Sequence, residues 1–172
     1  MISQALDRAE SLIATIPDFP EPGILFRDIS PLLADADALR TVADALVEPF
    51  VGTFDVVAGV EARGFLLAGA TAIAAGVGMV PIRKAGKLPR PAASVSYALE
   101  YGEAAIEMAA DLPPGSRVLL LDDVLATGGT LRAAKQLLTT LGYEVAGTAV
   151  LMELEQLGGR AVCGDVHALF KV

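Results

Sequence analysis

The sequence predicts an α/β fold in which helices cover both faces of a central parallel sheet. Runs of apolar residues that have the length of strands alternate with stretches that have the apolar spacing of helices. The runs are apolar at nearly every position, which is typical of strands buried on both faces. Consecutive parallel strands need a crossover between them, and a helix is the usual one. At 172 residues the chain suits one domain, and we expect residues 1–172 to form it.

The amino-terminal part is predicted to hold two helices with an irregular stretch between them. Residues 3–15 carry apolar side chains on one helix face, and the prolines and glycine of "PDFPEPG" end that helix. A short extended piece and a turn follow in "ILFRDISPLL". Residues 37–50 have the pattern of a second helix, with Asp35 or Asp37 as its N-cap.

Strands and helices alternate over the rest of the chain. Strands are predicted at 55–60, 79–82, 117–121 and 144–154, helices at 65–75 and 129–141, and the carboxyl-terminal "DVHALFKV" is typical of a further strand. One long segment, residues 83–116, interrupts this order and has no clear helical pattern. Within it, "SVSYALEYGEAAIEM" alternates around Gly102, which indicates an antiparallel hairpin. An insertion of this length after a strand is where an active-site lid would lie.

Composition excludes several classes of function. The chain is 53% hydrophobic and 20% charged, which is typical of a globular protein, and its net charge of -8 argues against general nucleic-acid binding. Its only histidine, His167, excludes a site built on several histidines, and we interpret it as structural. Its only cysteine, Cys163, is interpreted as a small buried apolar residue.

The chain is expected to act in the cytoplasm and away from membranes. A lone cysteine allows no intrachain disulfide and fits a reducing compartment. The first residues mix charged with apolar side chains and do not resemble a signal peptide. Residues 64–82 carry no charge, but their glycines, proline and small side chains favour a buried helix, a turn and a strand over a membrane span.

Two adjacent aspartates precede a glycine-rich turn in "VLLLDDVLATGGT". Thr127, Gly128, Gly129 and Thr130 lie between a predicted strand and a predicted helix, where backbone N–H groups and hydroxyls can bind a phosphate. The loop lacks the lysine of a P-loop. Asp122 and Asp123 either cap the strand end or accept hydrogen bonds from a vicinal diol. Beside a phosphate loop, the pair favours a ribose 5-phosphate.

Two other predicted strand ends carry basic residues. "GVEARGF" places Arg63 at a strand-to-helix turn, where it either pairs with a phosphate or is a solvated cap. "IRKAGKLPR" contains Arg83, Lys84, Lys87 and Arg90. Such a loop can be an ordinary solvated one, but focused positive charge in an acidic chain favours a small polyanion such as pyrophosphate.

Together these segments resemble the type I phosphoribosyltransferases. "VLLLDDVLATGGT" is similar to the phosphoribosyl-pyrophosphate motif of that family. "FPEPGILFRDISPLL", "EARGF", "IRKAGKLPRP" and "YALEYGEAAIEM" resemble its adenine-specific members, in order, from about residue 17 to residue 155. The resemblance implies the family's fold, a five-stranded parallel sheet flanked by helices with a hairpin hood loop, here about residues 83–116. It also implies transfer of the 5-phosphoribosyl group from phosphoribosyl pyrophosphate to adenine, giving AMP and pyrophosphate.

The resemblance also assigns roles to residues. Asp122 and Asp123 match the acidic pair that faces the ribose hydroxyls, and Glu100 matches the general acid/base of the hood. The loop for the 5-phosphate would be Ala126, Thr127, Gly128, Gly129 and Thr130. The pyrophosphate would meet Glu61, Ala62, Arg63, Arg83, Lys84 and Lys87, and the hood would add Tyr101. Adenine would lie against Leu25, Phe26 and Arg27 on one side and Val124 and Leu125 on the other.

Further expectations follow from the same resemblance. The peptide bond between Glu61 and Ala62 is often cis in the family. Mg²⁺ would arrive mainly on phosphoribosyl pyrophosphate, with no cage of protein ligands. The chain would form a homodimer in which Arg83 reaches the neighbouring subunit's site. Two alternatives stay open: a related enzyme for another purine base, and a non-catalytic sensor of phosphoribosyl pyrophosphate.

Overall fold

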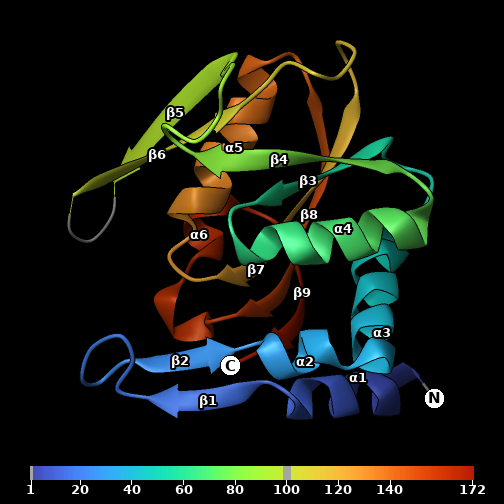
Figure 1. The fold of residues 1–172 in the computed structure, drawn as a ribbon, viewed down its shortest axis with the longest axis vertical. Coiled ribbons are helices and arrows are strands. Elements are labelled where there is room, and N and C mark those ends of the chain that lie inside the picture. The colour runs from blue at the N-terminus through green and yellow to red at the C-terminus, as the bar shows by residue number, and fades with distance from the viewer. Residues whose placement is uncertain (1, 99–101) are drawn as a thin grey trace.

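The structure is a computed structural model that describes residues 2–98 and 102–172. Its centre is a seven-stranded sheet (Figure 1). The strands are, in spatial order, β5 (Ala93–Ala98), β6 (Glu103–Met108), β4 (Gly78–Lys84), β3 (Val56–Val60), β7 (Arg117–Leu125), β8 (Glu144–Glu153) and β9 (His167–Lys171). The five strands from β4 to β9 are parallel. This is the predicted parallel sheet, and the predicted hairpin, β5 and β6, adds to its edge in antiparallel register.

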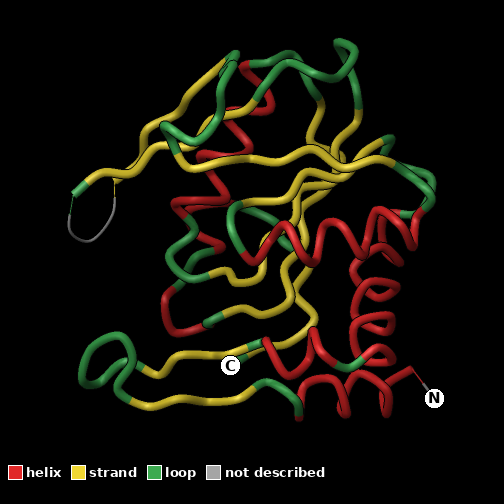
Figure 2. Tube along the Cα trace, viewed as in Figure 1, coloured by secondary structure: helices red, strands yellow, loops and turns green. Residues whose placement is uncertain are grey.

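Helices cover both faces of the parallel strands (Figure 2). On one face lie α3 (Ala36–Val47) and α4 (Arg63–Ala75), with α1 (Ile2–Ser11) and α2 (Ser30–Ala34) packed against α3. The other face is covered by α5 (Gly129–Thr140), with the short α6 (Arg160–Cys163) beside it. Two 3-10 turns, η1 (Glu48–Phe50) and η2 (Glu155–Leu157), complete the helical segments that the structure describes. None of these helices combines the length and apolarity that crossing a bilayer requires.

Strand β7 buries apolar side chains on both faces of the sheet. Val118 and Leu120 belong to the core beneath α5, whereas Leu119 and Leu121 belong to the core beneath α3 and α4. All four side chains are fully buried. Burying an aliphatic side chain of this size contributes about 1.5–3 kcal/mol. The continuous apolar run therefore stabilises both layers at once.

The amino-terminal region departs from the prediction of one helix over residues 3–15. The helix ends at Ser11, and β1 (Ala14–Pro17) pairs antiparallel with β2 (Leu25–Asp28). Leu12 and Ile13 still pack against the core, so the apolar spacing of the helix continues beyond its end. The β-branched residues and proline that follow favour an extended backbone.

The second predicted helix begins at Ala36, and its last predicted residues form η1 instead. Of the two candidate N-caps, Asp35 is the one that caps: its side chain accepts a hydrogen bond from the Ala38 N–H, at 2.9 Å. The same carboxylate pairs with Arg8 of α1, at 2.5 Å. One side chain thus starts α3 and fixes α1 against it.

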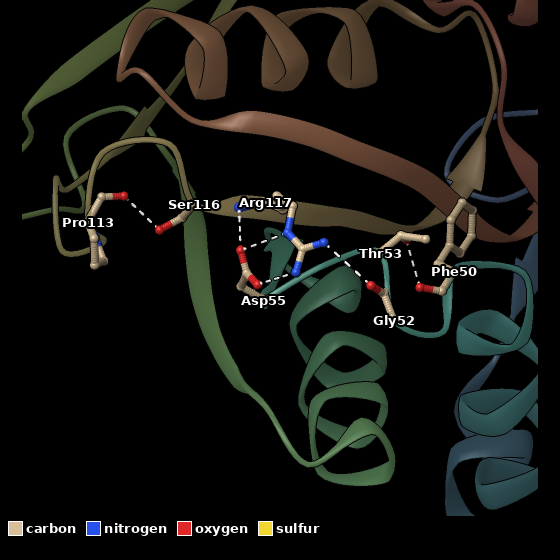
Figure 3. A network of polar contacts seen from close by, with 7 residues as sticks. All are labelled: Phe50, Gly52, Thr53, Asp55, Pro113, Ser116 and Arg117. Atoms are coloured by element: carbon tan, nitrogen blue, oxygen red, sulfur yellow. Dashed lines mark hydrogen bonds and ion pairs between the residues drawn. The ribbon is translucent and has the colours of Figure 1, made fainter.

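The amino ends of β3 and β7 are held together by an ion pair (Figure 3). Arg117, the first residue of β7, places its Nη2 2.6 Å from Oδ1 of Asp55, which directly precedes β3. The Arg117 backbone N–H donates to the other carboxylate oxygen at 2.9 Å, and its Nη1 donates to the Gly52 carbonyl at 3.4 Å. The hydrogen bonds from Arg117 lower the pKa of the Asp55 carboxyl below its ordinary value.

We predict that Asp55→Asn lowers the Tm at neutral pH and leaves catalysis unchanged, because this pair lies at the amino ends of the strands. A carboxyl whose pKa is depressed in the folded state adds stability above its ordinary pKa, 3.8, and loses it as the pH falls. The difference in Tm between the two proteins should therefore shrink in acid. Thermal unfolding across pH checks this, with Asp111→Asn, an exposed carboxylate, as the control. Equal Tm values at neutral pH would contradict the prediction.

Candidate active site

Polar residues gather where β3, β4 and β7 end. Glu61, Ala62 and Arg63 follow β3, and residues 126–128 connect β7 to α5. β4 continues beyond its predicted end because it pairs with β6, so Arg83 and Lys84 of the predicted basic loop are its last residues and only Lys87 and Arg90 follow it. Two hairpins, β5–β6 and β1–β2, extend beyond the body of the molecule on the left of Figure 1, one at the top and one at the bottom. Ligands of open α/β sheets bind at the carboxyl ends of parallel strands, so this is where a site is expected.

The acidic pair lies inside a strand, not after one. β7 continues to Leu125 because β8 runs beside it, and Asp122 pairs with Val150 in that register. The exposed fractions of Asp122 and Asp123 are only 8% and 6%. The Asp123 backbone N–H donates to Oδ1 of Asp122, at 2.8 Å. Burial, and then the neighbouring charge of Asp123, raise the pKa of the Asp122 carboxyl well above its ordinary value.

Arg63 connects the acidic pair to the β1–β2 hairpin. Its Nε lies 2.7 Å from Oδ2 of Asp123, and its guanidinium lies over the Phe26 ring, 5.1 Å from the ring centre. A cation at this distance from a ring face is attracted to it. Arg63 is thus fixed from two sides, with its side chain 38% exposed.

A cavity of about 480 Å³ opens beside the acidic pair. It is lined by Val60, Glu61, Ala62, Arg63, Lys84, Tyr97, Ala104, Ile106, Asp122, Asp123 and Thr130. These residues come from the loop after β3, the end of β4, both strands of the hairpin, β7 and the start of α5. The cavity therefore brings together three separate segments that the sequence predicts for a sugar phosphate and its pyrophosphate.

The basic loop is held at this cavity by one carboxylate. Glu61 accepts hydrogen bonds from Lys87 Nζ at 2.8 Å, from the Lys84 backbone N–H at 2.9 Å and from Arg83 Nε at 3.2 Å. These bonds, led by that from Lys87, lower the pKa of Glu61 to about 2. The Arg83 guanidinium also lies near the Phe65 ring, 5.9 Å from its centre. The peptide bond between Glu61 and Ala62 is cis.

The glycine-rich turn forms a second, smaller cavity of about 120 Å³. It is lined by Asp122, Val124, Leu125, Ala126, Thr127, Gly128, Thr130 and Leu131. Gly128 precedes α5 and has a φ of 84°, which non-glycine residues rarely adopt. The first N–H groups of α5 thus face a small cavity, as in an anion site at a helix N-terminus.

A third cavity, also of about 120 Å³, lies between the β1–β2 hairpin and the ends of β7 and β8. Its lining is Ile24, Leu25, Phe26, Arg27, Arg63, Asp123, Val124, Met152 and Leu154. Phe26 is supported edge-on by Phe19, with ring centres 5.1 Å apart. The lining is mostly apolar, with few polar groups, which suits a flat heterocyclic ligand.

The structure brings most of the predicted site residues to these three cavities. Leu125, which was predicted to lie against adenine, is fully buried and lines the cavity of the glycine-rich turn instead. Arg83 and Lys87 contact the large cavity's residue Glu61 but do not line that cavity themselves. Glu100 and Tyr101 lie outside the described residues.

Several lining residues were not predicted from the sequence. The hydroxyl of Tyr97 lies 3.3 Å from Thr130 Oγ1 and closes the large cavity from the hairpin side. Its place in the alternating segment "SVSYALEYGEAAIEM", where it pairs with Ala104, is a signal that could have marked it. Met152 and Leu154 line the third cavity because β8 is the neighbour of β7. No local motif reveals that neighbourhood.

Comparison with known proteins places the chain in a family. Residues 29–161 match the model of the phosphoribosyl transferase domain. The chain is 61% identical to adenine phosphoribosyltransferase of Clavibacter sepedonicus, over 99% of this chain and 90% of that protein. It is 54% identical to that of Thermobifida fusca, over 96% of this chain and 94% of the relative.

Solved structures agree. The crystal structure of adenine phosphoribosyltransferase from Rhodothermus marinus superposes with a TM-score of 0.91 at 46% identity, over 99% of both chains. That from Saccharomyces cerevisiae, complexed with an imino-altritol bisphosphate and adenine, has a TM-score of 0.91 at 36% identity, over 97% of this chain and 99% of the yeast chain. The chain therefore belongs to the phosphoribosyltransferase family, within its group of adenine phosphoribosyltransferases.

Proposed function

We propose that this chain transfers the 5-phosphoribosyl group from phosphoribosyl pyrophosphate to adenine, giving AMP and pyrophosphate, in purine salvage. The main observation in support of the proposal is that each of the three cavities is lined by at least one residue of the acidic pair. Asp122 lines the large cavity and that of the glycine-rich turn, while Asp123 lines the large cavity and the apolar one. A ribose held at the pair would have its 5-phosphate, its pyrophosphate and its base each directed to a different cavity.

In this proposal the 5-phosphate occupies the loop from Ala126 to Thr130. Backbone N–H groups at the start of α5 and the hydroxyls of Thr127 and Thr130 supply the donors. The ribose hydroxyls donate to Asp122 and Asp123. For Asp123, this requires sharing with, or displacing, Arg63, which is its partner at 2.7 Å. Arg63 is then available to the pyrophosphate, for which a guanidinium is a bidentate donor.

Pyrophosphate would leave toward the basic loop. Glu61 holds Lys87 and Arg83 at the edge of the large cavity, and Lys84 lines it. Cations placed in advance stabilise a leaving group without reorganising during the reaction. In the homodimer that we also propose, Arg83 reaches toward the partner's site. The exposed apolar residues Leu66 and Ile73 on α4, 56% and 83% exposed, support an interface on that face.

Adenine would lie in the apolar cavity beside Phe26, with the main chain of residues 25–27 reading its edge. Leu25, Arg27 and Val124 line this cavity, whereas Leu125 belongs to the core on the other face of β7. The yeast relative is complexed with adenine and that of Giardia lamblia with 9-deazaadenine, which supports this base over other purines.

The acceptor oxygens of the site fit Mg²⁺ carried by the substrate. Among the described residues, no group of three or more His, Cys, Asp or Glu side chains could hold a metal ion. Mg²⁺ commonly binds through one or two carboxylates together with substrate phosphates and waters. Asp122 and Asp123 supply such carboxylates beside the ribose. When bound, the ion would neutralise charge on the departing pyrophosphate.

The reaction breaks the bond from C1 of the ribose to pyrophosphate oxygen and forms a bond from C1 to an adenine nitrogen, which loses its proton. Glu100 of the hood is proposed as the general acid/base for that proton, and Tyr101 as its neighbour over the site. The acidic pair and the phosphate loop orient the sugar, and the hairpin would exclude water from the cationic C1. We assign all of this to one domain, residues 1–172, acting in the cytoplasm.

We predict that the protein forms AMP when incubated with Mg²⁺, phosphoribosyl pyrophosphate and adenine. Hypoxanthine, guanine and xanthine should react far more slowly, because the similar enzymes are named for adenine and those of yeast and Giardia lamblia are complexed with adenine and 9-deazaadenine. Chromatography of the nucleotide products checks both statements. Absence of AMP would contradict the proposal, and faster reaction of another base would favour the sibling activity. Binding of phosphoribosyl pyrophosphate with no product from any base would indicate a sensor.

We predict that Glu100→Gln lowers kcat by about 10²-fold or more, the usual contribution of general acid–base catalysis. The KM for phosphoribosyl pyrophosphate should change by less than about threefold, since the loss falls on the transition state. Glu103→Gln is the matched control, an exposed carboxylate at the start of β6 in the same hairpin. Steady-state kinetics measure kcat and the KM for phosphoribosyl pyrophosphate in both variants. A parallel loss in kcat and in affinity would show that Glu100 is structural.

We predict that Asp122→Asn stabilises the fold at neutral and higher pH while weakening phosphoribosyl-pyrophosphate binding. A carboxyl whose pKa is raised by folding contributes stability only below its ordinary pKa, 3.8, and loses it as the pH rises through the folded-state value. The gain in Tm should thus be large at about pH 8 and vanish at about pH 4. Thermal unfolding across pH and calorimetric titration measure the two effects.

The adjacent variant, Asp123→Asn, is the matched control for this prediction. It removes the partner of Arg63 and should lower the Tm at neutral pH. If Asp122→Asn lowered the Tm at every pH, the pair would serve to cap the strand end and not to hold a sugar.

A further inference from the structure

We propose that residues 158–166, which we name the carboxyl-terminal strap, position the 5-phosphate loop. The inference rests on the proposed function, because it takes the loop after β7 to hold the 5-phosphate. Four observations of the strap carry it: a backbone-to-backbone contact, the conformation of one glycine, and tethers to two different elements.

The strap touches the loop without any side chain between them. A Cβ on Gly159 would lie 2.4 Å from the carbonyl oxygen of Ala126 and 2.6 Å from Cδ1 of Leu125. A Cβ on Gly128 would lie 2.4 Å from the carbonyl oxygen of Gly159. The backbone at each glycine thus packs directly against the backbone of the other segment. The strap therefore restricts where the backbone of the loop can lie.

Gly159 is not required by its own conformation. Its φ and ψ are -58° and -28°, an ordinary helical geometry that any residue adopts. What demands glycine at this position is its close approach to Ala126 and to the side chain of Leu125. Gly128 differs, because its φ of 84° requires glycine in addition to the contact. Gly159 is therefore the position at which the contact alone can be tested.

The strap is fixed to β8 on one side. Arg160 donates to both carboxylate oxygens of Glu153, the last residue of β8, with distances of 2.7 to 3.0 Å. Its Nη1 also donates to the Val166 carbonyl at 2.6 Å, which closes the strap on itself. Glu153 is only 5% exposed, whereas the Arg160 side chain is 39% exposed, so the carboxylate is the buried partner of this ion pair. Glu153 pairs in register with Leu125, the residue just before the loop.

The strap is fixed to α5 on the other side. Lys135 donates from Nζ to the Cys163 carbonyl at 2.6 Å and to the Asp165 carbonyl at 3.3 Å. α5 is the helix that starts at the phosphate loop. The strap is thus held by α5, which begins at the loop, and by β8, which pairs with β7 up to the residue before the loop. A binding loop retains productive geometry only if its supporting contacts hold it closely.

Gly159→Ala tests this inference, with Gly78→Ala as the matched control because a Cβ on Gly78 meets nothing within 4 Å. We expect the KM for phosphoribosyl pyrophosphate and the Kd of ribose 5-phosphate to rise about tenfold, as the donors of the loop shift. The KM for adenine, and kcat at saturation, should stay within about twofold. Steady-state kinetics and calorimetry give all four values. Unchanged phosphate affinity in a folded Gly159→Ala protein, or an equal loss in every constant, would overturn the inference.

Lys135→Met keeps the test decisive if Gly159→Ala does not fold. It loosens the strap from α5 without a clash, and should raise the same two phosphate constants by about threefold. Lys171→Met, which removes an exposed pair with Glu155, is its control and should change neither. No selective change in Lys135→Met would also overturn the inference.

Thr127→Ala separates failure of the strap from failure of the proposed function. If it raises the phosphate constants while the strap variants do not, the inference alone fails. If the unaltered protein does not bind ribose 5-phosphate and Thr127→Ala leaves its kinetics unchanged, the assignment of the loop fails with it.

Discussion

The site depends on one constraint, which is that β7 carries two carboxylates into a place largely closed to water. The strand continues past its apolar run because β8 pairs with it as far as Glu153, and Asp122 therefore remains inside a paired strand. A buried charge is costly, so burial, and then the charge of Asp123, raise the pKa of the Asp122 carboxyl, although its Oδ1 accepts a hydrogen bond from the Asp123 N–H. Asp123 remains partnered by Arg63. Asp122 therefore lowers the stability of the folded protein at neutral pH, and its proposed role as an acceptor for the sugar hydroxyls accounts for its presence there.

Close backbone packing places the other parts of the site around this pair. A Cβ on Gly64 would lie 3.0 Å from Oδ1 of Asp122, which is tighter than an ordinary contact, so glycine there lets the first turn of α4 lie close against β7. A Cβ on Gly59 would lie 2.6 Å from the Cβ of Ala68, which brings α4 equally close to β3. Both contacts bring the start of α4, and with it Arg63, close to the acidic pair. These glycines, one in β3 and one in α4, therefore set distances between the layers.

The sequence carries the parallel sheet and the chemistry of its strand ends, because both are local properties. An apolar run predicts a buried strand from its own residues, and "DD" before "TGGT" needs no distant partner to be noticed. What the sequence does not carry depends on pairing between distant segments. The turn from α1 into β1 is decided by the pairing of Thr15 with Arg27, and the base cavity gains Met152 only because β8 lies beside β7. The role of Gly159 has the same origin, since its helical conformation gives no sign of the contact it makes.

Pairing of opposite charges within the site explains how a chain of net charge -8 can receive a polyanion. Glu61 holds Lys87 and Arg83 before any substrate arrives, and Asp123 holds Arg63. Cations gathered without such partners would repel one another and spread into solvent. Because the pKa of Glu61 is about 2, its carboxylate stays charged throughout the range in which a phosphate ester carries its full charge. The negative residues are thus what keep the positive ones in place, and in the proposed function the incoming phosphates would compete for cations that are already oriented.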